Sequence, residues 1–144
     1  GIVTFQFGKG TSALITFPVG SLYDHTRHYG HSALMLSVLT ELLGHQSSIT
    51  TDASPLLELS HQVSHTGSFE WFGLMNHSGQ LGNGFFKPQA LPAFNLHFRP
   101  AGEVKGIRLL RADRSVEFKV GEDGQVGFEI DGLEFYDIAL VTYD

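Results

Sequence analysis

The sequence contains no cysteine, which excludes disulfide bonds and thiolate metal sites. Nine Lys and Arg residues stand against fifteen Asp and Glu residues, and no long basic run is present, which argues against a nucleic-acid or anionic-membrane surface. No apolar run approaches the roughly 18 residues needed to span a bilayer. The chain begins with Gly1 and shows no signal-peptide pattern, so we expect a trimmed or processed start. The compartment is left open, because a protein without cysteine can reside in the cytoplasm or be exported.

The amino-acid composition is typical of a folded protein that is rich in β-structure. The 144 residues are 42% apolar and 17% charged, which provides for a core in one ordinary domain or two small halves. Twelve Phe and seventeen Gly residues favour strands joined by tight turns. The net charge of −6 is most simply explained by solubility.

Residues 1–45 predict a β-hairpin followed by one helix. Ile2–Phe7 and Thr11–Phe17 are extended runs separated by the turn sequence GKG, and Pro18 and Gly20 end the second run. The sequence HSALMLSVLTELLG then has helical periodicity and ends at Gly44, where a left-handed C-cap is expected. Its wide apolar stripe comprises Leu34, Met35, Leu36, Val38, Leu39, Leu42 and Leu43.

Residues 46–55 are polar and predict a linker, and residues 56–144 predict an all-β domain. This second part has no helical period, and its breaks carry Gly or Asp. About seven short strands at this spacing favour an antiparallel Greek-key β-sandwich, so the whole chain is predicted to be mostly β. The expected strands are Leu56–His65, Phe69–Asn76, Phe94–Arg99, Val104–Leu110, Val116–Val120, Val126–Ile130 and Phe135–Thr142.

The two parts differ in how they can bury apolar surface. A sandwich of some ninety residues can hold its own core, whereas a hairpin and one helix cannot. The first part is therefore expected to pack on the sandwich, to belong to a larger α/β domain, or to pair with another copy of the chain. We favour pairing, because an edge strand such as Ile2–Phe7 is a template for β-addition.

The order of motifs resembles the C-terminal end of large bacterial glycoside hydrolases of the family 42 β-galactosidase type and their uncharacterised relatives. The resemblance rests on the GKG hairpin, a helix that ends in LTELLG, MNHSG at a strand end, and the terminal DGQVGFEIDGLEFYDIALV. It implies that residues 1–45 end a glutamine-amidotransferase-like α/β domain, also called the trimerisation domain, and that residues from about 56 form the closing sandwich. In this family the catalytic carboxylates lie in a barrel that is absent here, so the resemblance implies no catalytic residue and no cofactor for this chain.

Three histidines, His25, His28 and His31, are spaced three apart in the sequence YDHTRHYGH. They are the candidates for a metal site, although helical histidine pairs that bind metals typically use a spacing of four. The alternative is a helix approach whose imidazoles pack or form a cap, and Gly30 argues against a regular helix there.

Aromatic residues are the candidates for ligand binding. Phe85 and Phe86 lie in the long loop GQLGNGFFKP and suit contact with a sugar or a protein partner, unless they close the end of the sandwich. Trp71 is a third candidate, but apolar residues on both faces of its strand predict that it belongs to the core.

The leading interpretation is a non-catalytic accessory module of a multidomain, carbohydrate-active protein, with a structural or subunit-contact role. Its expected partners are the parent catalytic domain or another copy of the chain, with carbohydrate as a further candidate. One alternative is a free-standing carbohydrate-binding sandwich. Another is a small hydrolase with a His/Asp site that the sequence does not locate. The compartment is open between bacterial cytoplasm and periplasm or secretion.

Overall fold

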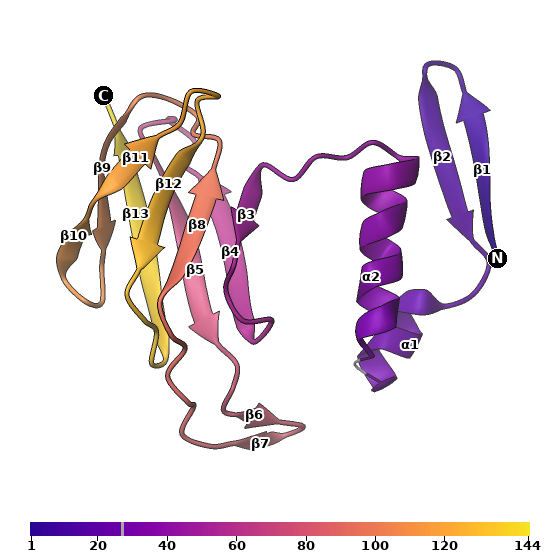
Figure 1. Ribbon diagram of the computed structural model, residues 1–144, viewed down its shortest axis with the longest axis horizontal. Helices are drawn as coiled ribbons and strands as arrows, with labels where there is room; N and C mark the ends of the chain where they lie inside the picture. The colour runs from indigo at the N-terminus through magenta and orange to yellow at the C-terminus, as the bar shows by residue number, and fades with distance from the viewer. Residues whose placement is uncertain (27) are drawn as a thin grey trace. The chain divides into compact units, whose positions relative to one another are not determined.

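The computed structural model describes residues 1–26 and 28–144 and divides the chain into two compact units, Gly1–Ser47 and Ser48–Asp144 (Figure 1). Its mostly β architecture, with a hairpin, helix and antiparallel sandwich in chain order, confirms the predicted fold class.

The first unit opens with the predicted hairpin. Strand β1 (Ile2–Phe7) pairs antiparallel with β2 (Gly10–Ile15), so that Ile2 lies opposite Ile15. Gly8 has a φ of 60°, a left-handed conformation that glycine adopts without steric cost, and this allows the short turn.

The helical segment that follows is longer than the periodicity predicted. Helix α1 (Val19–Thr26) begins directly after Pro18, whose carbonyl accepts a 2.9 Å hydrogen bond from the Leu22 amide. Pro18 therefore both ends the hairpin and supplies the carbonyl that accepts the first hydrogen bond of the helix. Helix α2 (Tyr29–Ser37) continues into a π-helical turn, η1 (Val38–Leu42), and Gly44 then has the expected positive φ of 66°.

The apolar side chains of the first unit are poorly covered. Among its described residues only Val19 and Val38 are buried. Phe7 is 85% exposed and Leu36 is 60% exposed, and the other leucines of the predicted stripe from Leu39 onward are also exposed. This unit therefore has little core of its own.

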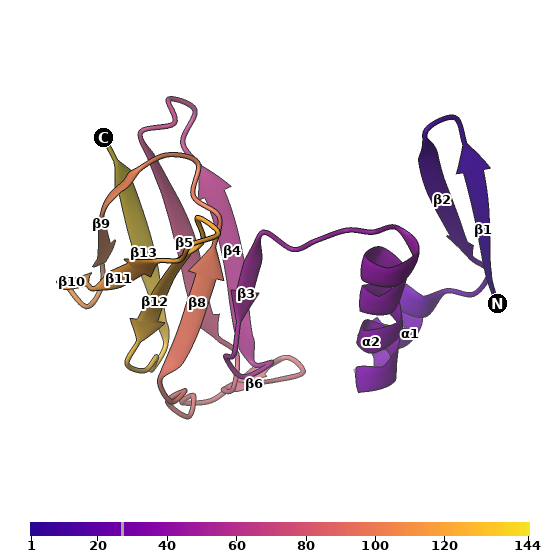
Figure 2. The same cartoon turned by 45° about the horizontal axis from the view of Figure 1, so that its top comes forward.

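The second unit is a sandwich of a five-stranded and a four-stranded antiparallel sheet, ordered β10-β9-β13-β5-β4 and β11-β12-β8-β3. In both overall views β8 and β12 pass in front of β5 and β13 (Figures 1 and 2). A separate small hairpin of β6 and β7 lies in the connection that joins β5 to β8. The strands are β3 (Ile49–Thr51), β4 (Leu57–Val63), β5 (Phe69–Asn76), β6 (Gln80–Leu81), β7 (Gly84–Phe85), β8 (Phe94–Phe98), β9 (Val104–Leu109), β10 (Arg114–Val116), β11 (Phe118–Val120), β12 (Val126–Ile130) and β13 (Tyr136–Tyr143).

Two features of the sandwich depart from the predicted strands. The single strand expected over Val116–Val120 is divided at Glu117, because β10 pairs with β9 while β11 pairs with β12 in the opposite sheet. In addition, Ile49–Thr51 forms an edge strand on β8 within the range that the sequence assigned to a linker. The described sandwich thus has more strands than the predicted seven, and the chain crosses from one sheet to the other at Glu117.

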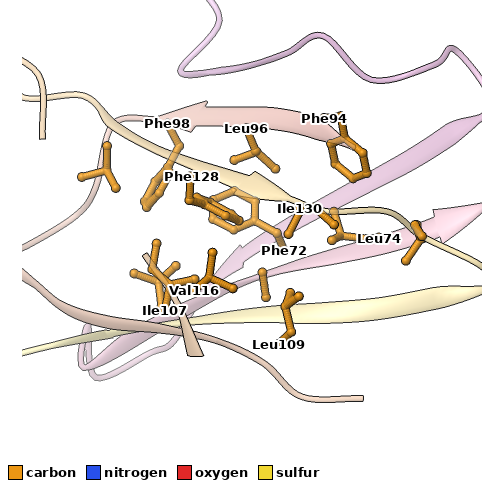
Figure 3. Packing of buried hydrophobic residues seen from close by; sticks show 14 of the residues in the cluster. Phe72, Leu74, Phe94, Leu96, Phe98, Ile107, Leu109, Val116, Phe128 and Ile130 are labelled. Carbon is orange, nitrogen blue, oxygen red and sulfur yellow. The ribbon is translucent and has the colours of Figure 1, made fainter. Parts of the chain in front are cut away.

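The core lies between the two sheets and is built around three phenylalanines (Figure 3). Phe72 of β5 meets Phe98 of β8 edge-on at 4.9 Å between ring centroids, and Phe128 of β12 lies 6.3 Å from Phe72. Such tilted and edge-to-face arrangements are favourable for aromatic rings. Alternate residues of β5, β8, β12 and β13 supply the rest of the apolar filling.

A histidine–glutamate pair lies at the margin of this core. Glu70, on the inner face of β5, is fully buried, and its Oε2 lies 2.5 Å from Nε2 of His61 on β4. The imidazole of His61 stacks on Phe72 with 4.6 Å between centroids. Oε1 of Glu70 has no hydrogen-bond partner among the described residues, so the carboxylate depends on His61 for its stabilisation.

We expect Phe72→Ala to lower the free energy of unfolding of the sandwich by about 3–5 kcal/mol, because it removes the ring that packs against both Phe98 and Phe128. Chemical denaturation followed by the fluorescence of the single tryptophan, Trp71, measures this directly. The matched control is Phe85→Ala, whose ring is 79% exposed and whose loss should change the stability by no more than about 0.5 kcal/mol. Equal effects of the two substitutions would contradict the assigned core.

Candidate functional site

An aromatic pocket of about 320 Å³ lies at the end of the sandwich where β5 ends and β13 begins. Three segments line it: residues 75–80 at the end of β5, residues 85–88 after the small hairpin, and residues 135–136 at the start of β13. Its walls combine four aromatic rings with Met75 and Pro88. A pocket with apolar walls and a few convergent polar groups is the usual form of a small-molecule site.

The side chain of Asn76 ties these segments together. Asn76 is the last residue of β5 and is only 8% exposed. Its Nδ2 lies 2.7 Å from the carbonyl oxygen of Gln89 and 2.8 Å from that of Glu134, and its Oδ1 accepts a 3.0 Å hydrogen bond from the Ser78 amide. One buried amide therefore fixes both walls of the pocket relative to the sandwich, because Gln89 follows one wall and Glu134 precedes the other.

Backbone contacts reinforce the same framework. Leu91 and Leu133 are buried and exchange backbone hydrogen bonds of 2.9 and 3.1 Å beneath the two loops. On the pocket side the Phe86 amide donates a 2.8 Å hydrogen bond to the Gly79 carbonyl. A Cβ atom at Gly79 would lie 2.4 Å from the carbonyl oxygen of Phe86, so only glycine allows the two chain segments to approach this closely.

The polar edge of the pocket is formed by His77 and Gln80. Nδ1 of His77 lies 2.8 Å from Oε1 of Gln80, and its Nε2 lies 2.8 Å from the carboxylate of Glu58 on β4, outside hydrogen-bond geometry. The first contact orients the Gln80 side chain and leaves its amide nitrogen without a protein partner among the described residues. Hydrogen-bonding groups thus lie beside the aromatic walls.

The opposite wall, Phe135 and Tyr136, is held by Arg111. The guanidinium carbon of Arg111 lies 5.0 Å from the ring centroid of Tyr136 and 5.7 Å from that of Phe135, within the range of cation–π attraction. The Asp137 carboxylate is buried and accepts hydrogen bonds from the amides of Arg111 and Ala112. This wall is therefore fixed from behind by β13 and the β9–β10 turn.

The structure places two of the three predicted ligand-binding residues in this pocket. Phe85 and Phe86 both line it, and they are 79% and 67% exposed instead of closing the sandwich. Trp71 lies outside the lining, half-buried on the outer face of the five-stranded sheet, so the expectation that it is a core residue is wrong. A Cβ at Gly73 would lie 3.1 Å from the Trp71 ring, which shows that the indole extends over this glycine.

Met75, Phe135 and Tyr136 also line the pocket, although they are not among the three predicted ligand-binding residues. Their place in the pocket follows from the pairing of β5 with β13, in which Met75 lies opposite Tyr136. Sequence periodicity cannot specify this pairing, because the two strands are separated by some sixty residues. The motif MNHSG was the available signal, since it contains Asn76 at the strand end.

The three clustered histidines serve as local hydrogen-bonding groups. Nδ1 of His25 lies 2.9 Å from the Ser21 carbonyl oxygen, and Nδ1 of His28 accepts a 3.0 Å hydrogen bond from the Gly30 amide at the N-terminus of α2. Nδ1 of His31 lies 3.3 Å from the Thr26 hydroxyl. Within residues 1–26 and 28–144 no group of three or more His, Cys, Asp or Glu side chains is arranged to hold a metal ion. The metal site at these histidines stays a prediction.

The fold has a counterpart among solved structures. The chain aligns with alpha-L-fucosidase isoenzyme 2 from Paenibacillus thiaminolyticus at a TM-score of 0.76 and 20% sequence identity, over 98% of this chain. It spans only 22% of the fucosidase chain. No protein-family model and no curated protein sequence matches. The likeness therefore establishes a shared fold with one region of a much larger glycoside hydrolase. None of the helices in the described part of the chain is long and apolar enough to cross a membrane.

We expect Asn76→Asp to destabilise the end of the sandwich, because a carboxylate would face the carbonyl oxygens of Gln89 and Glu134. Leaving buried acceptors unpaired costs about 1–3 kcal/mol each, so a loss of at least about 2 kcal/mol is expected in chemical denaturation. Limited chymotrypsin digestion should also cut faster at Phe85 and Phe86. The matched control is Asn83→Asp in the exposed loop. Similar stability of the two variants would show that Asn76 does not fix the pocket walls.

We expect zinc to raise the melting temperature by no more than about one degree. A ligand at 100 times its dissociation constant adds about 2.7 kcal/mol of stability, which a thermal scan would detect. A clear rise that disappears in His28→Ala would instead establish the metal site.

Proposed function

We propose that this chain is a non-catalytic accessory region of a larger, multidomain carbohydrate-active protein, and that its role is structural or one of subunit contact. The proposed parent is a glycoside hydrolase of the family 42 β-galactosidase type or a related enzyme. The observation that carries the proposal is the alignment of nearly the whole chain, through both units, with 22% of an α-L-fucosidase chain.

The exposed apolar surface of the first unit supports a contact role. Monomeric proteins rarely expose large contiguous apolar patches, and such patches commonly mark interfaces. Here the helix carries Leu36, Leu39 and Leu42 at 60%, 41% and 43% exposure, and the hairpin adds Phe5 at 50%. Fully burying one such side chain is worth roughly 1.5–3 kcal/mol. The proposed partners are the parent catalytic domain or another copy of the chain.

The carboxylates of the sandwich support a non-catalytic role. Glu70 is enclosed and paired with His61, and Asp137 holds the β9–β10 turn through backbone amides. Glu58 lies beside His77 at the polar edge of the pocket. Glu70 and Asp137 therefore have structural roles, whereas a glycoside hydrolase typically uses a pair of carboxylates on either side of the bound glycosidic bond.

We expect the purified chain to hydrolyse none of a panel of nitrophenyl glycosides, including the α-L-fucoside and the β-D-galactoside. The measurement is release of nitrophenol over a long incubation, with a catalytically competent fucosidase and galactosidase as positive controls. Turnover that is abolished in Glu58→Gln, with folding preserved by circular dichroism, would overturn the non-catalytic assignment. The same variant provides the test for contaminating enzyme, because contamination would be unaffected by it.

A further inference from the structure

The pocket at the end of β5 joins flat rings to hydrogen-bonding groups. The rings of Phe85, Phe86 and Tyr136 lie in its lining and are at least half exposed. The amide of Gln80 lies in the same lining, and the imidazole of His77 orients it through the contact with Oε1. A pyranose ring has the matching character, since it presents a face of C–H groups and an edge of hydroxyl groups. Aromatic faces pack against the first, and amides and imidazoles hydrogen-bond the second.

The charges around the pocket select a neutral ligand. Lys87 is paired with Glu134 at 3.6 Å, and His77 lies beside the carboxylate of Glu58 at 2.8 Å. The guanidinium of Arg111 lies against aromatic rings. The cations Lys87 and Arg111 and the carboxylates of Glu134 and Glu58 thus lie around the rings. Among the described residues, no cluster of unpaired cations is present there to attract a phosphate or carboxylate. An unmodified sugar satisfies this charge balance.

Size and rigidity further restrict the ligand. At about 320 Å³ the pocket lies at the small end of the range for small-molecule sites, which suits one or two sugar rings. Asn76 and Gly79 fix its walls in the free protein, so little ordering is needed on binding. We infer that this pocket binds a neutral pyranose ring of a carbohydrate, with Phe86 and Tyr136 against the C–H face and the amide of Gln80 directed to the hydroxyl groups.

This site goes beyond the accessory role proposed above and does not depend on it. A non-catalytic region can serve as a contact without binding sugar, and a sugar can bind whether or not the first unit contacts another protein. The alternative occupant of the pocket is an apolar side chain of a protein partner. The amide nitrogen of Gln80 favours the sugar, because a purely apolar side chain would leave this group without a hydrogen-bond partner.

The test is saturation-transfer difference NMR on the full chain with the methyl glycosides of glucose, galactose, mannose, xylose and fucose. We expect saturation transfer to the ring protons of at least one of them and an apparent dissociation constant from titration. Phe86→Ala should weaken that binding roughly tenfold, as expected for the loss of one stacked ring. Phe7→Ala is the matched control, because Phe7 is 85% exposed in the first unit and should leave binding unchanged.

Three results would overturn the inference. The first is no saturation transfer to any of the five glycosides from a protein that circular dichroism shows to be folded. The second is binding that Phe86→Ala and Gln80→Ala both leave unchanged, which would place the sugar elsewhere. The third is the absence of sugar binding together with self-association that Phe86→Ala abolishes in light scattering, which would make the pocket a protein contact. None of these outcomes bears on glycoside hydrolysis, so failure here is separable from failure of the accessory role.

Discussion

The two-sided character of β5 is the constraint on which the sandwich depends. Its inner face carries Phe72 into the core and ends with Asn76, whereas its outer face carries Trp71 and Met75. Because successive side chains of a strand point in opposite directions, a single register on β13 fixes core and outer surface together. The same register sets Met75 opposite Tyr136, and both residues line the pocket. Core and candidate site are therefore products of one strand pairing.

The two units of the chain bury their apolar side chains to different extents. The sandwich surrounds the rings of Phe72, Phe98 and Phe128 with two sheets. The hairpin and helices of the first unit bury only Val19 and Val38 among their described residues. A folded domain has only about 5–15 kcal/mol of net stability. The exposed leucines at several helix positions therefore leave the first unit without a substantial part of the stabilisation that their burial would contribute. This asymmetry gives the proposed contact role its physical basis.

Local patterns predicted most of the fold. The hairpin around GKG, the helix that ends at Gly44 and the alternation in β8, β9 and β12 all follow from turn residues and periodicity. The predictions that were wrong concern features that depend on contacts between distant parts of the chain. Glu117 divides one predicted strand between two sheets, and Trp71 lies on an outer face that a one-dimensional pattern cannot distinguish from a second buried face. For the site, loop length and aromatic content pointed to Phe85 and Phe86. The role of Asn76 could not be predicted, because it depends on contacts with Ser78, Gln89 and Glu134 that only the folded chain brings together.

Hydrogen–deuterium exchange of the full chain, measured by mass spectrometry at low and high protein concentration, tests the central claim most directly. The account predicts strong, concentration-independent protection of β5, β8 and β12, because local opening there requires loss of the shared core. It predicts weak protection of β1 and α2 at low concentration, which increases when the chain self-associates or when a partner is added. Protection of β1 and α2 equal to that of β5 in a dilute monomer would contradict it, because the first unit would then be stable without a partner.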